Sequence, residues 1–147
     1  MVGAQTLSEL IIAEINFFRA EKSLAPLGTS ECLDRAAQHH ANWMAEARSG
    51  GHTEFRRIGQ IIPLAEPSDR FAKFGCRGFG ENVLRWYPAG ESHAKTAKGV
   101  VQAWIDSPAH YELILCPQIN DQVQLGIGIS QWVDRSGASY CLTLGLK

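Results

Sequence analysis

Two strand-like segments at the C-terminal end constrain the fold of this chain more than any other feature. The segments Q-L-G-I-G-I-S-Q-W-V and A-S-Y-C-L-T-L-G-L flank the turn-forming residues D-R-S-G, and this order predicts an antiparallel β-hairpin. The segments before the hairpin show helical periodicity instead. Helices first and a hairpin last predict an α+β fold, in which helices pack on an antiparallel sheet.

The first two helices are predicted from their ends and their apolar stripes. Thr6 begins the first helix, because T-L-S-E places Glu9 at the third helical position of a capping box. The pair Gly50-Gly51 ends the second helix. The stripes that we expect to face the core are Leu7, Ile11, Ile15 and Phe18 in the first helix, and Leu33, Ala37, His40 and Met44 in the second.

The middle of the chain predicts irregular structure and three shorter helices. Residues 52–67 contain breakers and are expected to be irregular. S-D-R-F-A-K-F-G predicts a short helix capped by Ser68, and further helices are predicted from about residue 94 to 104 and after the N-cap Ser107. The glycine-rich run G-F-G-E-N at residues 78–82 is interpreted as a turn.

The composition is that of one ordinary globular domain, spanning residues 1–147. Apolar residues make up 45% and charged residues 20% of the chain, and the formal net charge of −1 provides no field that attracts nucleic acid or an anionic membrane. No apolar run approaches the roughly 20 residues that cross a bilayer. Glu9 and Glu14 interrupt the first segment where a signal peptide is apolar, so we expect either a cytosolic protein or a chain that begins at its mature domain.

Four cysteines are spread widely along the chain, at Cys32, Cys76, Cys116 and Cys141. They form no C-x-x-C pair, so a structural zinc site made of all four is not expected. Four cysteines allow three disulfide pairings, and the spacing does not choose among them. Free thiols in a reducing compartment and disulfides in an oxidising one both stay open at this point.

Three of the five histidines favour structural or solvated roles. His39 and His40 are consecutive on a predicted helix, so we expect them to face different directions and to share no ligand. His40 lies on the apolar stripe, where a hydrogen-bonded core histidine is more common than a metal ligand. His93 precedes a helix in a polar stretch and is expected to be solvated.

The other two histidines and one carboxylate are the candidates for chemistry. His52 directly follows a glycine pair that lets the backbone turn sharply, and His110 lies in the first turn of a helix, whose positive end disfavours the protonated ring. With Glu81 they provide two imidazoles and a carboxylate, the ligand types of an open zinc site. No H-E-x-x-H, G-x-S-x-G, Walker or dinucleotide motif occurs. Spacing alone therefore leaves this trio as a hypothesis.

The order of the motifs resembles the CAP superfamily, also called SCP-like, which includes cysteine-rich secretory proteins, antigen 5 and plant pathogenesis-related proteins. The compact bacterial type is most similar, and the resemblance covers nearly the whole chain. Its motifs, in chain order, are Asn16-x-x-Arg19, Leu24 to Leu27, L-D-R-A-A-Q-H-H-A-N-W-M-A with His40, His52, S-D-R-F, Gly80 to Val83, V-V-Q-A-W-I-D-S-P-A-H-Y-E-L-I-L and L-G-I-G-I-S.

This resemblance implies an α-β-α sandwich, in which a small antiparallel sheet lies between helical layers and a cleft opens over one side. The family lines that cleft with two histidines and two acidic residues. Three of the positions fall on His52, Glu81 and His110, while the second acidic position falls at Ser107, with Asp106 one residue before it. Asn82 is expected to hold the turn around Glu81. Secretion and disulfide bonds are also implied.

Three functions follow as hypotheses, and the sequence does not decide whether the protein is an enzyme. The first is a secreted, extracellular or periplasmic binding module whose cleft holds a divalent metal, zinc, through His52 and His110. The second is a zinc-dependent, protease-like hydrolase that uses Glu81 as general base. The third is a lipid- or surface-binding protein. The ligand of the cleft is expected to be a small molecule, a lipid or a peptide, and not a nucleic acid.

Overall fold

The structure, a computed structural model, describes residues 3–55, 64–87 and 90–147 of the chain. Within these residues it contains five helices and four strands. The helices are α1 (Leu7–Glu21), α2 (Glu31–Ala47), α3 (Pro67–Phe74), α4 (His93–Ile105) and α5 (Pro108–Ile114), and the strands are β1 (Gly28–Thr29), β2 (Arg77–Trp86), β3 (Val123–Gln131) and β4 (Ala138–Leu146). No described helix is long and apolar enough to cross a membrane.

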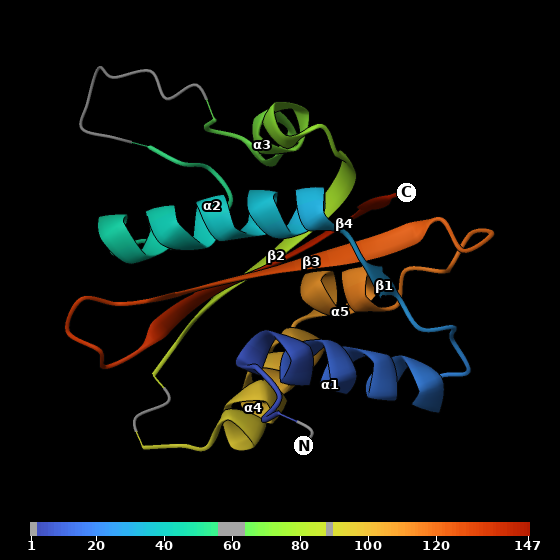
Figure 1. The fold of residues 1–147 in the computed structure, drawn as a ribbon, viewed down its shortest axis with the longest axis horizontal. Coiled ribbons are helices and arrows are strands. Elements are labelled where there is room, and N and C mark those ends of the chain that lie inside the picture. Colours follow the sequence, from blue (N-terminus) through green and yellow to red (C-terminus); the bar gives the residue numbers. More distant parts are fainter. Residues whose placement is uncertain (1–2, 56–63, 88–89) are drawn as a thin grey trace.

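The four strands form one sheet between two helical layers, which confirms the predicted α+β sandwich. The strand order is β1-β3-β4-β2, with β4 antiparallel to both of its neighbours. Helices α2 and α3 cover one face, and α1, α4 and α5 cover the other (Figure 1). The sheet is mixed rather than wholly antiparallel, because the two-residue strand β1 runs parallel to β3. The predicted hairpin is β3 and β4.

Helix α2 lies unusually close to strand β3 because two glycines face it. A Cβ atom on Gly126 would clash with the backbone of Leu33, and one on Gly128 would clash with the backbone of Ala37. Two residues of a strand and four residues of a helix both advance by roughly 6 Å. The alternate glycines of L-G-I-G-I therefore match successive turns of α2, and the helix axis runs along the strand.

Side chains of α2 also complete the edge of β3 where the short strand β1 has ended. The carboxylate of Asp34 accepts a hydrogen bond from the Ile127 amide at 2.9 Å. Gln38 accepts from the Ile129 amide at 3.1 Å and donates to its carbonyl at 2.7 Å. Asp34 and Gln38 are four residues apart on α2, and the amides that they contact are two residues apart on β3, so both side chains lie opposite an amide. The edge is thereby covered, and it does not offer free backbone groups to another strand.

The predicted helical stripes are buried as expected. Ile11 and Ile15 of α1 pack with α4 and the sheet in the main core, and Leu7 and Phe18 lie at its border. All four stripe residues of α2 are buried, including His40. The capping box at Thr6 and Glu9 is present.

Two local predictions are wrong. Helix α3 begins two residues earlier than expected, and Glu66, not Ser68, is its N-cap, in a capping box with Asp69. The run G-F-G-E-N is part of strand β2 and not a turn. The segment 52–67, predicted to be irregular, is described only outside residues 56–63.

The cysteine pairing left open by the sequence is resolved in part. Cys32 at the start of α2 forms a disulfide with Cys76, just before β2, across a sequence separation of 44 residues. Closing a loop of that length stabilises a fold by about 4 kcal/mol in the chain-entropy account. Cys116 and Cys141 are free thiols.

We expect Gly128→Ala to lower the free energy of unfolding by about 1–3 kcal/mol or more, because the new methyl group forces α2 away from β3. Gly28→Ala is the matched control, since a Cβ there meets no atom within 4 Å. Urea denaturation of both variants measures the difference. Equal stability of the two variants would show that the close approach of α2 is not required.

Candidate functional site

A bulge in β2 directs Glu81 toward helix α3. The pairing of β2 with β4 shifts register between Gly78 and Gly80. A Cβ on Gly78 would meet the Phe71 ring of α3, whereas one on Gly80 would meet Leu113 of α5, on the other face of the sheet. The extra residue therefore reverses which face each later side chain takes, and Glu81 returns to the α2 and α3 side.

The carboxylate of Glu81 is buried and held from two sides. Its side chain is 2% exposed, and its Oε1 atom accepts a hydrogen bond from Nδ1 of His52 at 2.9 Å. Nη2 of Arg70 donates to both carboxylate oxygens, at 2.9 and 3.1 Å. Burial alone raises the pKa of Glu81, but the hydrogen bond from His52 and the charges of His40 and Arg70 outweigh it, so the pKa is lowered. Glu81 is therefore ionised at neutral pH.

Arg70 is the cation at the centre of this cluster. It is fully buried, and besides Glu81 it donates to the backbone carbonyls of His52 at 2.9 Å, Leu64 at 3.1 Å and Ala65 at 2.8 Å. Its Nη1 atom lies 3.5 Å from a second carboxylate, that of Glu54. One side chain of α3 thus ties the segment after α2, the segment before α3 and strand β2 together.

Glu54 contacts both His39 and His40, a shared hydrogen-bond partner that the sequence did not predict. Nδ1 of His39 lies 3.2 Å, and Nδ1 of His40 3.0 Å, from the same carboxylate oxygen. The segment that follows α2 folds back along the helix, so one carboxylate reaches both rings. Nε2 of His40 also lies 2.7 Å from the carbonyl of Gly51. Both ring nitrogens of His40 therefore face an acceptor, and the ring is fixed between Glu54 and Gly51.

His110 approaches the same strand from the other helical layer. It lies in α5, and the side chain of Asn82 donates to its backbone carbonyl at 3.0 Å. Asn82 is buried and holds this first turn of α5 against β2, rather than the predicted turn around Glu81. Burial, and then the charge of nearby His52, lowers the pKa of the His110 ring. The prediction that His110 stays neutral at pH 7 therefore has a physical basis, although desolvation is its main cause.

The other two predicted cleft residues lie at helix ends. Asp106 is the C-cap of α4, is exposed, and accepts a hydrogen bond from Gln102 at 2.8 Å. Ser107 is the N-cap of α5, as predicted, but its side chain makes no capping hydrogen bond. The second carboxylate of the cluster is Glu54, two residues after His52. Sequence reasoning missed Glu54 and Arg70; the available signal was an arginine beside Phe71 on the apolar side of a short helix.

An open cavity of about 350 Å³ adjoins the cluster. His52 and Glu81 lie in its wall, with Phe71, Phe79 and the glycines of β2. Phe79, the bulged residue, is 48% exposed, which is high for a large apolar side chain. The ionic cluster thus meets an apolar surface at the cleft.

The metal expected from the resemblance fits this site only as an open two-histidine site. Among the described residues, no three histidine, cysteine or acidic side chains are grouped so that they could hold an ion. Glu81 already binds His52 and Arg70. Nε2 of His52 and the ring of His110 are the remaining donors, so water would have to supply the other ligands.

Comparisons with known proteins agree with this architecture. The sequence model of the family described as "CAP: Cysteine-rich secretory protein family" matches residues 12–136. No curated protein sequence matches the chain.

Three solved structures have the same fold at low sequence identity. An outer surface protein from Borrelia burgdorferi has 20% identity and a TM-score of 0.68, over 98% of this chain and 95% of that one. An extracellular SCP-domain protein from Bacillus anthracis has 17% identity and a TM-score of 0.66, over 99% of this chain and 45% of its own. A cysteine-rich secretory protein from Staphylococcus aureus has 16% identity and a TM-score of 0.57, over 96% and 38%. This chain spans less than half of the last two proteins.

Replacing Arg70 tests whether the cluster depends on its one guanidinium. We expect Arg70→Met to lower the free energy of unfolding by about 3–5 kcal/mol, because two buried carboxylates lose their cation. Arg35→Met removes an exposed ion pair with Glu31 and should cost less than about 1 kcal/mol. Chemical denaturation compares the two, and similar costs would contradict the role given to Arg70.

The two cleft histidines should titrate on opposite sides of the usual value of 6.5. The hydrogen bond to Glu81 raises the pKa of His52, so its stabilisation is complete below 6.5 and is lost as pH rises through the higher folded value. The lowered pKa of His110 acts in the opposite sense, because stability falls as pH drops below 6.5. NMR titration of the ring signals, with chelator present, measures both values. Glu81→Gln should lower the pKa of His52, and an unchanged value would contradict the assignment.

Proposed function

Because this chain belongs to the CAP family of cysteine-rich secretory proteins, we propose that it is a binding module whose cleft holds a divalent metal ion, zinc in the first place, between His52 and His110. The hydrogen bond from Nδ1 of His52 to the buried carboxylate of Glu81 carries this proposal. When bound, the ion would offer open coordination positions to a ligand in the cleft. Glu81 would hold the ring of His52 in the orientation that binds the ion.

The two rings differ in how readily they bind a metal at neutral pH. Glu81 accepts the hydrogen bond of Nδ1–H of His52, which leaves Nε2 as the ring nitrogen that can bind a metal. Because the pKa of His52 is raised, the metal must displace the proton from Nε2. The lowered pKa of His110 keeps its lone pair free at pH 7. Two protein ligands imply weak affinity, and the nearby charge of Arg70 reduces it further.

The environment of Glu81 favours a positioning role over general base catalysis. A general base that works near neutral pH benefits from a raised pKa and a free oxygen. Glu81 has a lowered pKa, and both of its oxygens accept hydrogen bonds from Arg70. The hydrolase that uses Glu81 as base is therefore less well supported than the binding module.

We further propose an extracellular or periplasmic location. The disulfide between Cys32 and Cys76 is typical of oxidising compartments. The structurally similar proteins from Borrelia burgdorferi and Bacillus anthracis are described as an outer surface protein and an extracellular protein.

Calorimetric titration with zinc tests the metal site. His52→Ala and His110→Ala should each weaken zinc binding at least about tenfold, and Glu81→Gln about tenfold or more, through loss of ring orientation. His93→Ala is the matched control, because His93 is exposed at the start of α4 and outside the cleft. Zinc binding that is unchanged in the His52 and His110 variants would refute the proposal.

A further inference from the structure

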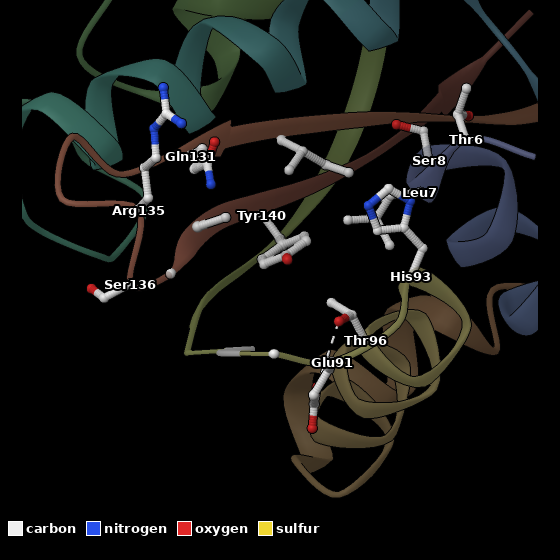
Figure 2. A pocket seen from close by; sticks show the side chains of 14 residues that line it. Thr6, Leu7, Ser8, Glu91, His93, Thr96, Gln131, Arg135, Ser136 and Tyr140 are labelled. Carbon is white, nitrogen blue, oxygen red and sulfur yellow. Dashed lines mark hydrogen bonds between the residues drawn. The ribbon is translucent and has the colours of Figure 1, made fainter.

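A second cavity lies on the other side of the sheet from the His52 cluster. Its volume is about 510 Å³, and it is enclosed by the N-terminal ends of α1 and α4 and by the β3–β4 hairpin (Figure 2). This volume is within the roughly 300–1,000 Å³ of small-molecule sites. No residue of the proposed metal cleft lines it, so it is a separate site.

The cavity combines an apolar floor with polar side chains at its border. Ala138 of the main hydrophobic core forms part of the wall, with Leu7 and Ile129, which are partly buried and pack against that core. Ser8 and Gln131 lie at the border, whereas Arg135 extends away from the enclosed space (Figure 2). A molecule that fills this space therefore needs an apolar body.

The hydroxyl of Tyr140 is a polar group of the cavity wall that makes no hydrogen bond to the described residues. Tyr140 is 1% exposed and lines the cavity from β4. Among the described residues its hydroxyl has no hydrogen-bond partner, and the one hydrogen bond drawn in Figure 2 joins Thr96 to Glu91. A hydroxyl that lines a cavity without a protein partner is satisfied by water or by a ligand.

The electrostatics of the cavity indicate the charge of its ligand. Burial, and then the negative charge of Glu91, raises the pKa of Tyr140 to about 12. The hydroxyl therefore keeps its proton and is available as a donor. The same negative charge opposes a carboxylate or other anion beside Tyr140.

We propose that this cavity binds an uncharged small molecule with an apolar body and a hydrogen-bond acceptor, and that the acceptor receives the hydrogen bond of the Tyr140 hydroxyl. The apolar body lies against Leu7 and Ile129. His93, at the first turn of α4, also lines this space (Figure 2).

Two ring compounds of equal size test the proposal by NMR. The ¹⁵N-labelled chain is titrated with benzamide, which is uncharged and carries an acceptor, and in parallel with benzoate, which is an anion. Benzamide should give saturable shifts at the amides of Leu7, Thr96 and Tyr140, with affinity several-fold higher than benzoate. Tyr140→Phe should weaken benzamide binding about 3–10-fold, the effect of one lost hydrogen bond.

Tyr87→Phe is the matched control, because Tyr87 is 67% exposed and outside this cavity; its affinity for benzamide should equal that of the original chain. Tyr140→Phe without ligand should change Tm by less than about 2 °C, since the hydroxyl has no protein partner to lose. A larger fall in Tm would reveal such a partner and overturn the proposal. No saturable binding, equal affinity for benzoate, or full affinity in Tyr140→Phe would also overturn it.

Discussion

The guanidinium of Arg70 lies between the carboxylates of Glu54 and Glu81, and the geometry of the cleft depends on it. Taking charges out of water costs several kcal/mol per ion, and a buried ion pair often contributes no more stability than a well-packed apolar group would. The cluster is therefore better explained by how it positions the segments around the cleft than by a contribution to the stability of the fold. Arg70 has enough donors to bind Glu81 and three backbone carbonyls, including that of His52, at once. Because removing any partner leaves a charge uncompensated, these segments have one favourable arrangement, and it presents His52 to the cleft.

This arrangement also separates the two roles that a glutamate beside a histidine can play. A base must exchange its proton with a substrate or with water, whereas an orienting carboxylate must stay ionised and keep its hydrogen bond. Burial raises the pKa of Glu81, but the hydrogen bond from His52 and the charges of His40 and Arg70 lower it further than burial raises it. The His52 side chain is 45% exposed, so its outer side meets solvent while Nδ1 is held by Glu81. The contacts of Glu81 therefore favour a role in orienting the His52 ring over a role in proton transfer.

The sequence predicts the parts of this fold that follow from local periodicity, and it fails where partners come from distant segments. The hairpin, the capping box at Thr6 and the buried stripe of α2 follow from spacing alone. The sequence predicts a turn at residues 78–82 of β2, because the glycines at 78 and 80, which make room for Phe71 and Leu113, are also typical turn residues. The bulge also breaks the alternation that would have indicated a strand. The shared contact of His39 and His40 with Glu54 depends on a chain reversal that helix geometry does not reveal. The family resemblance implies that His52, Glu81 and His110 line one cleft. In the structure His52 and Glu81 are in direct contact.

Strand β4 explains how one small domain can have two separate cavities. Successive side chains of a strand point to opposite faces, so Cys141 packs with α2 while Tyr140 and Leu142 pack with α1 and α4. The whole strand from residue 138 to 145 is buried, and it is hydrogen-bonded to β2 on one side and β3 on the other. A ligand beside Tyr140 would therefore contact β4, whereas a ligand beside His52 would contact β2, the strand paired with β4. Close-packed interiors do not deform continuously, so a shift of β4 would have to break pairing on both sides. The two sites can thus bind different molecules without competing for any side chain.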